Sequence, residues 1–102
     1  MGTHGNARAI FRRAIDRGNL LVADATAREM GQITLEEALD LLALMGRFGD
    51  KRFDRAAVRW LQRLLDERTL SLVDVQVVVA NVAALASARR ASAVDALRAF
   101  VR

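Results

Sequence analysis

The stretch over residues 72–86 constrains the fold of this chain more than any other segment, because it is apolar on nearly every side of a helix. Only three of its fifteen residues are polar, namely Asp74, Gln76 and Asn81. A helix that is apolar all round is normally enclosed by other protein segments. We therefore expect a helix over residues 71–88 to be the central element of the fold, with the other helices packed around it.

Composition favours one compact all-α domain. The chain has 102 residues, of which 53% are hydrophobic and 27% charged, and it contains neither proline nor cysteine. That apolar content is high enough to offset the entropy of ordering a chain of ordinary single-domain length. Because apolar residues recur at helical rather than alternating spacing, we expect five or six helices in antiparallel hairpins. Residues 1–102 form one helical domain in this interpretation, with a flexible start at residues 1–5.

Glycines and capping residues place the helix boundaries. Gly18 ends the first helix, and Asn19 caps a second one over residues 20–30. Two capping boxes, in which a hydroxyl residue is followed three positions later by a carboxylate, begin later helices after Thr34 and Ser71. The later helices are expected from 34 to 46–49, over 51–68, over 71–88 and over 92–101, the last of them capped by Ser92.

The two capping boxes also indicate an internal repeat. Their hydroxyl residues, Thr34 and Ser71, lie 37 positions apart, and apolar residues match at the same offset, as in Leu42 with Val79. Helical repeats of similar length are built from pairs of antiparallel helices. We interpret the chain as a first hairpin followed by two related hairpins.

No residue pattern in the chain predicts catalysis or a bound cofactor. Without cysteine there is no thiol nucleophile, disulfide or thiolate metal site. The single histidine, His4, lies in the expected flexible start, so no serine in the folded body has a histidine base to activate it. An amino-terminal copper or nickel site at His4 would need a free amine on Gly2, which Met1 prevents. We expect a non-enzymatic protein with no catalytic, metal-binding or cofactor-binding residues.

Arginines are the main feature of the expected surface. Fifteen of the sixteen basic residues are arginine, and four of them form a stripe along the helix expected at 51–68. The stripe consists of Arg52, Arg55, Arg59 and Arg63. Together with Arg8 and Arg12 of the first helix, it is our candidate partner-binding surface. It could bind an acidic protein surface, follow a nucleic-acid backbone, or form ion pairs with acids of the same chain. Those acids are Glu36, Glu37, Asp40, Asp50, Asp54 and Asp66.

Charge gives limited support to nucleic-acid binding. The isoelectric point is about 11.2 because little besides arginine titrates above neutrality, whereas the formal net charge is only +4. Residues 27–41 resemble a DNA-reading helix-turn-helix, but its second helix would present Glu36, Glu37 and Asp40 to the phosphates. The expected repulsion disfavours DNA reading through this element.

Three segments resemble the small helical proteins that are abundant in actinobacterial genomes. They read ARAIFRRA at 7–14, ATAREMG at 25–31 and VRWL at 58–61. The resemblance implies a bacterial origin, and it supplies no functional residues to carry over.

These observations favour a protein-interaction or accessory module in the cytoplasm. The chain starts without a signal-peptide pattern, and the apolar run over 72–86 is shorter than the ~20 residues of a membrane span. Nucleic-acid backbone binding through the arginine-rich faces of the first helix and the 51–68 helix is the alternative. A homodimer is a third possibility, if the 71–88 helix stays partly exposed in the monomer. Salt separates the first two, because a nucleic-acid complex weakens steeply as salt rises.

Overall fold

The computed structural model describes residues 3–102, with side chains described from residue 6 onward. Six helices make up most of this part of the chain, and it contains no strand. They are α1 (Thr3–Arg17), α2 (Leu20–Met30), α3 (Leu35–Arg47), α4 (Phe53–Glu67), α5 (Leu72–Ala84) and α6 (Arg90–Val101). The predicted all-α fold is confirmed. The flexible start predicted for residues 1–5 lies partly outside this description, and the backbone of α1 already begins at Thr3.

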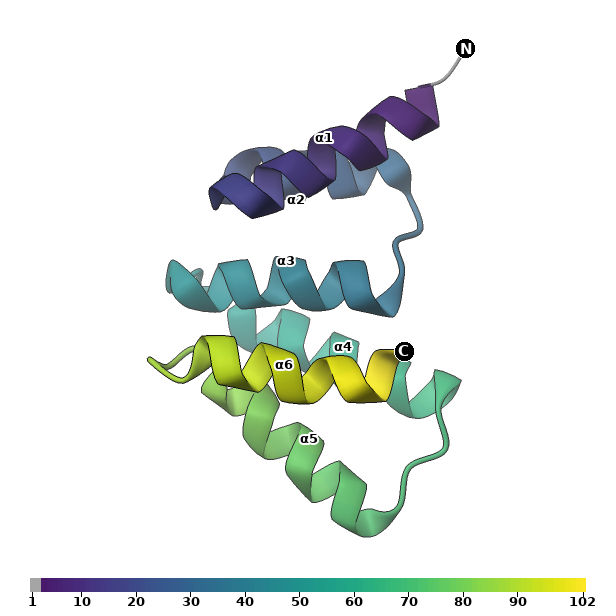
Figure 1. Cartoon of the computed structure of the whole chain (residues 1–102), viewed down its shortest axis with the longest axis vertical. Coiled ribbons are helices and arrows are strands. Elements are labelled where there is room, and N and C mark those ends of the chain that lie inside the picture. Colours follow the sequence, from purple (N-terminus) through teal and green to yellow (C-terminus); the bar gives the residue numbers. More distant parts are fainter. Residues whose placement is uncertain (1–2) are drawn as a thin grey trace.

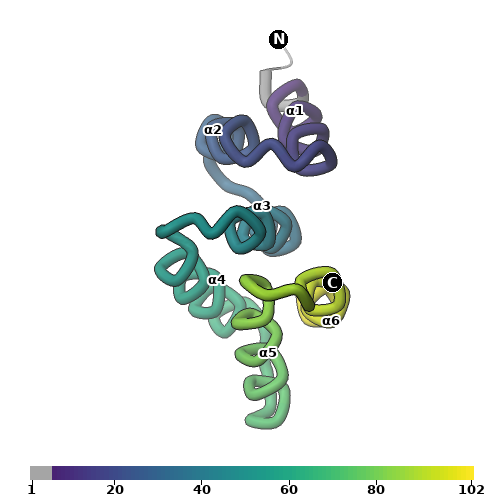
Figure 2. The backbone as a smooth tube through the Cα atoms, turned by 90° about the vertical axis from the view of Figure 1, so that its left-hand side faces the viewer, coloured from purple at the N-terminus to yellow at the C-terminus, as the bar shows by residue number. Residues whose placement is uncertain are grey.

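The helices are stacked along a molecule 45 Å long. α1 and α2 pack together at one end, α3 crosses the middle, α4 and α6 lie beyond it, and α5 forms the far end (Figure 1). A view at right angles places α1 and α6 on one side of α3 and α2 and α4 on the other (Figure 2). α3 contacts all four of these helices and is therefore the centre of the fold.

The prediction that the helix over 71–88 is central is wrong. Nine of the thirteen residues of α3 are buried, whereas α5 buries only Val78 and Val82. On the outer side of α5, the exposed fraction is 78% for Leu72 and 66% for Val73. The prediction rested on the apolar composition of residues 72–86. The carboxylates of α3 are paired with arginines of α1 and α6, which allows a helix that carries charges to be buried.

Both predicted capping boxes are present. The Thr34 hydroxyl accepts a hydrogen bond from the Glu37 amide at 3.0 Å, and the Glu37 carboxylate accepts one from the Thr34 amide at 2.8 Å. Ser71 and Asp74 form the same reciprocal pair at 3.1 and 3.2 Å. α3 and α5 begin directly after these caps, 37 positions apart, and have equal lengths, and α4 and α6 begin at the same offset. The helix boundaries thus follow the predicted repeat.

Two predicted boundaries in the last hairpin are wrong. α5 ends at Ala84 instead of continuing to residue 88, because the chain turns there and the Ser87 hydroxyl donates to the Ala84 carbonyl at 2.7 Å. α6 begins at Arg90, so Ser92 lies inside the first turn of the helix instead of capping it.

Two hydrophobic clusters hold the stack together. The larger cluster joins α3, α4, α5 and α6, and the smaller one joins the α1–α2 hairpin to α3 through Leu44. In the larger cluster α3 comes very close to the turn after α5. A Cβ atom at Gly46 would run into the backbone carbonyl of Leu85, so the packing requires a glycine at this position.

Candidate interaction groove

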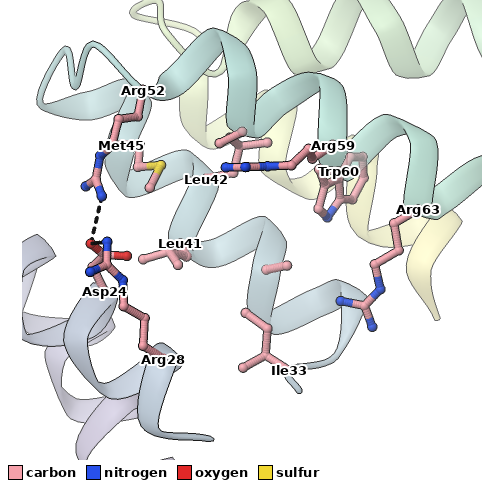
Figure 3. Close-up of a pocket in the computed structure, with 12 residues that line it drawn as sticks. Asp24, Arg28, Ile33, Leu41, Leu42, Met45, Arg52, Arg59, Trp60 and Arg63 are labelled. Carbon is pink, nitrogen blue, oxygen red and sulfur yellow. Dashed lines mark hydrogen bonds and ion pairs between the residues drawn. The ribbon is translucent and has the colours of Figure 1, made fainter. Parts of the chain in front are cut away.

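A groove of about 350 Å³ lies between α2, α3 and α4 (Figure 3). Its apolar lining consists of Ile33, Ala38, Leu41, Leu42, Met45, Ala56 and Trp60. Its charged lining consists of Asp24, Arg28, Arg52, Arg59 and Arg63. We call this site the arginine groove, because it combines an apolar floor with a rim of four arginines.

The amphipathic pattern of α4 builds one wall of the groove. Trp60 is only 4% exposed, and its indole Nε1–H donates to the Leu35 carbonyl at 3.1 Å, which fixes α4 against the start of α3. The buried side of α4 consists of Phe53, Ala57, Trp60 and Leu64. Arg59 and Arg63 lie at helical spacing beside this row, at the edge of the groove.

Asp24 of α2 connects two of the rim arginines. Its carboxylate accepts a hydrogen bond from Arg28 at 3.2 Å and another from Arg52 at 3.0 Å. Arg52 also forks onto Asp50 through Nε and Nη2, at 3.1 and 2.8 Å. The fork lowers the pKa of Asp50 to about 2, and the hydrogen bonds that Arg52 donates, first to Asp50 and then to Asp24, raise the pKa of Arg52. Arg52 is therefore a positively charged side chain that two aspartates hold in place at one end of the rim.

The remaining α4 arginines differ in their partners. Arg63 is bound to Glu67 one turn further along, with Nε and Oε2 2.6 Å apart. Arg59 lies between Arg52 and Arg63 on the α4 side of the groove (Figure 3) and has no carboxylate partner among residues 6–102. Arg55 points out of the arginine groove and lines a neighbouring hollow. The groove thus contains three of the four arginines of the predicted stripe.

Arg8 and Arg12 belong to the other side of α3. Arg8 donates to both carboxylate oxygens of Glu37, at 2.6 and 2.9 Å, and Arg12 donates to Asp40 at 3.0 Å. Arg98 of α6 reaches the second oxygen of Asp40 at 2.9 Å. The hydrogen bond from Arg8 is the main reason that the pKa of Glu37 falls to about 2. The six predicted arginines therefore do not form one continuous surface.

These ion pairs also overturn the expected exposure of the α3 acids. Glu37 and Asp40 are 9% and 6% exposed, and Glu36 is paired with Arg98 and Arg102. α3 would be the reading helix of a helix-turn-helix over 27–41, yet it is enclosed by four other helices. A helix buried in this way cannot enter a major groove.

Other chemistry has little support in the part of the chain that the structure describes. No group of three or more histidine, cysteine or acidic side chains there is placed to hold a metal ion. The considered site at His4 falls on a side chain outside the described residues. None of the described helices is long and apolar enough to cross a bilayer.

Sequence reasoning found the α4 side of the groove and missed the α2 side. Asp24 and Arg28 are one helical turn apart, so the ion pair itself has a sequence signal. No sequence signal indicates that these two residues lie opposite α4, because this position depends on how α2 crosses α3. Comparisons with protein-family models, curated proteins and solved structures found no match for this chain.

Proposed function

We propose that this protein is a cytoplasmic, non-enzymatic interaction module whose arginine groove binds an acidic amphipathic segment of another protein. The observation that carries this proposal is the position of Arg59, a rim cation that lies above an apolar floor and has no carboxylate partner among residues 6–102. A ligand that satisfies both features needs a carboxylate next to apolar side chains. Amphipathic helices that dock in apolar grooves have this chemistry.

Arginine is suited to such a ligand. Its planar guanidinium can donate two parallel hydrogen bonds to one carboxylate, and these charge-assisted bonds are stronger than neutral ones. Arg52 already binds two aspartates and Arg63 binds Glu67, so Arg59 has the donors that a partner would engage. The rim as a whole carries four arginines against Asp24, which favours an anionic partner.

The size of the groove limits what can enter it. A volume of about 350 Å³ is near the lower end of the ~300–1,000 Å³ that is usual for ligand sites. It accommodates a few apolar side chains from a short segment, such as those that recur on one face of a helix. We therefore propose that the partner contributes a single helical turn or two to this site.

Nucleic-acid backbone binding through α4 is the second candidate. It is favoured by the hollow beside the groove, whose lining contains four basic residues and a single acid, namely Lys51, Arg52, Arg55, Arg59 and Asp54. It is disfavoured because Arg8 is paired with Glu37 and because α1 and α4 lie on opposite sides of α3 (Figure 2). The basic faces of α1 and α4 cannot follow one backbone together.

The experiment measures binding of a labelled helical peptide with adjoining rows of leucine and glutamate. Arg59→Glu should weaken binding at least about tenfold, since a hydrogen bond to a charged group contributes ~1.5–3 kcal/mol. Arg13→Glu is the matched control, because Arg13 is exposed on α1 and forms no ion pair among the described residues. A second peptide with glutamine in place of glutamate should bind more weakly to the unchanged protein.

Equal binding of the acidic peptide to the Arg59→Glu and Arg13→Glu variants would contradict the proposal. Tight binding of a random duplex at ~0.15 M salt would favour the second candidate. In that case the Arg55→Gln, Arg59→Gln double variant should make the slope of log affinity against log salt shallower by nearly two units, at ~0.9 per phosphate contact.

A further inference from the structure

α5 has an apolar face that no part of the described chain covers. Four large side chains on this face are 41–78% exposed, namely Leu72 (78%), Val73 (66%), Val77 (41%) and Val79 (47%). Ala80 and Ala83 extend the same face and are also exposed. Contiguous exposed apolar surface of this kind usually marks an interaction site.

The corresponding face of the preceding repeat is buried. Leu35 and Leu42 of α3 are each 3% exposed and belong to the core shared with α4 and α6. The residues 37 positions later, Leu72 and Val79, are exposed. The exposed residues of α5 thus correspond to residues of α3 that pack against other helices.

The spacing of this face is that of a helix–helix seam. Two adjacent rows have helical spacing: Val73, Val77 and Ala80 in one, and Leu72, Gln76, Val79 and Ala83 in the other. Such rows interdigitate with the same rows of a second helix. The alanines at the carboxyl end allow the two backbones to approach closely.

The charge on this face indicates which helix fits it. Asp74 is the only charged residue between positions 69 and 88, and its carboxylate is bonded to the Ser71 amide as part of the helix cap. A partner that bound through charged side chains would therefore have no oppositely charged group to pair with on this face. Two copies of the face, in contrast, can pack together without repulsion between like charges. The Gln76 amide both donates and accepts hydrogen bonds, so it can pair with its own copy. Homodimer interfaces are also more apolar than other interfaces.

We propose that the α5 faces of two copies pack against each other across a two-fold axis, so that the protein is a homodimer. α5 does not line the arginine groove, so each copy keeps its groove open in the dimer. This inference does not depend on the proposed function of the groove. A dimer with two open grooves could engage two acidic segments of one partner, with the gain in apparent affinity that bivalency gives.

Sedimentation equilibrium over a range of concentrations tests the dimer. The mass of the unchanged protein should rise from 11.2 kDa toward twice that value. Leu72→Glu should raise the dimer dissociation constant at least about tenfold. Leu21→Glu is the matched control, because Leu21 is a leucine of similar exposure, 81%, in the first turn of α2. Val77→Glu, near the middle of the face, should weaken the dimer as well.

Three results would overturn this inference. One is an unchanged protein that remains a monomer up to ~1 mM, a limit that corresponds to very weak association. Another is an equal effect of Leu72→Glu and Leu21→Glu. The third is a monomer that binds vesicles of zwitterionic phosphatidylcholine through α5, which would assign the face to lipid. Arg59→Glu should dimerise like the unchanged protein, so failure of the groove proposal and failure of this one give different results.

Discussion

Asp40 and Glu37 show how single residues connect the layers of this molecule. Asp40 accepts hydrogen bonds from Arg12 of α1 and Arg98 of α6, while its own side chain is 4% exposed. Glu37 is held by Arg8 and also caps α3 through the Thr34 amide. Unpaired buried charges are costly, so each carboxylate requires its arginine. The ion pairs therefore determine which side of α3 faces α1 and α6.

The ion pair between Arg8 and Glu37 makes the stability of the folded protein depend on pH in the acidic range. The hydrogen bond from Arg8 lowers the pKa of Glu37 from about 4.5 to about 2 in the folded protein. A carboxyl group with a depressed folded pKa stabilises the fold above its unfolded pKa, and this contribution is lost as pH falls through the folded pKa. We expect the melting temperature, followed by circular dichroism, to fall between about pH 5 and pH 2. Glu37→Gln, which can still cap the helix, should reduce that fall.

Glu29→Gln is the control for this pH series, because Glu29 is exposed and forms no ion pair among the described residues. It should leave the pH dependence nearly unchanged. If Glu37→Gln and Glu29→Gln gave the same acid profile, the Arg8–Glu37 pair would not contribute as described.

At the scale of elements, local signals predicted the helices well and their burial poorly. The capping boxes at Thr34 and Ser71 depend on residues three positions apart, so they could be read directly from the sequence. The role of α5 could not be inferred in this way. Its apolar composition shows that something should cover it, but not that the rest of the chain does so. α3 is buried because of arginines far away in the sequence, which no local pattern indicates.

A substitution at Gly46 tests the close approach between α3 and the turn after α5. Alanine normally stabilises a helix relative to glycine by ~1 kcal/mol. Gly46→Ala should instead destabilise the protein by about 1–3 kcal/mol, since its Cβ would meet the Leu85 carbonyl. Ala83→Gly, at the exposed counterpart 37 positions later, should cost only the helix propensity. Urea unfolding measures both, and a stabilising Gly46→Ala would contradict the packing described here.

Adjacent valines test the orientation of α5. Val78 is 1% exposed and Val79 is 47% exposed. Val78→Asp places an unpaired charge in the core and should cost several kcal/mol, a large part of the ~5–15 kcal/mol that stabilises a typical domain. Val79→Asp should leave the melting temperature of the dilute protein close to that of the unchanged protein. Equal destabilisation by the two substitutions would show that α5 is enclosed on both sides.

At the scale of the whole molecule, α3 separates two different surfaces. On the side that carries α1 and α6, Arg8, Arg12 and Arg98 form internal ion pairs, and the side that carries α2 and α4 leaves Arg59 available beside an apolar floor (Figure 2, Figure 3). The arginine stripe of α4 could be predicted from its spacing. Its division from Arg8 and Arg12 could not, because it depends on the three-dimensional order of the hairpins.

The most direct test of this account maps the binding site by nuclear magnetic resonance. ¹⁵N–¹H spectra recorded during titration with the acidic amphipathic peptide report on each amide and on the indole N–H of Trp60, the only tryptophan. The account predicts that the largest shifts occur around the groove, at Ile33, Leu41 and the Trp60 indole, while Arg8 and its surroundings on the other side of α3 change little. Shifts centred on α1 and α6, or no shifts at saturating peptide, would contradict it.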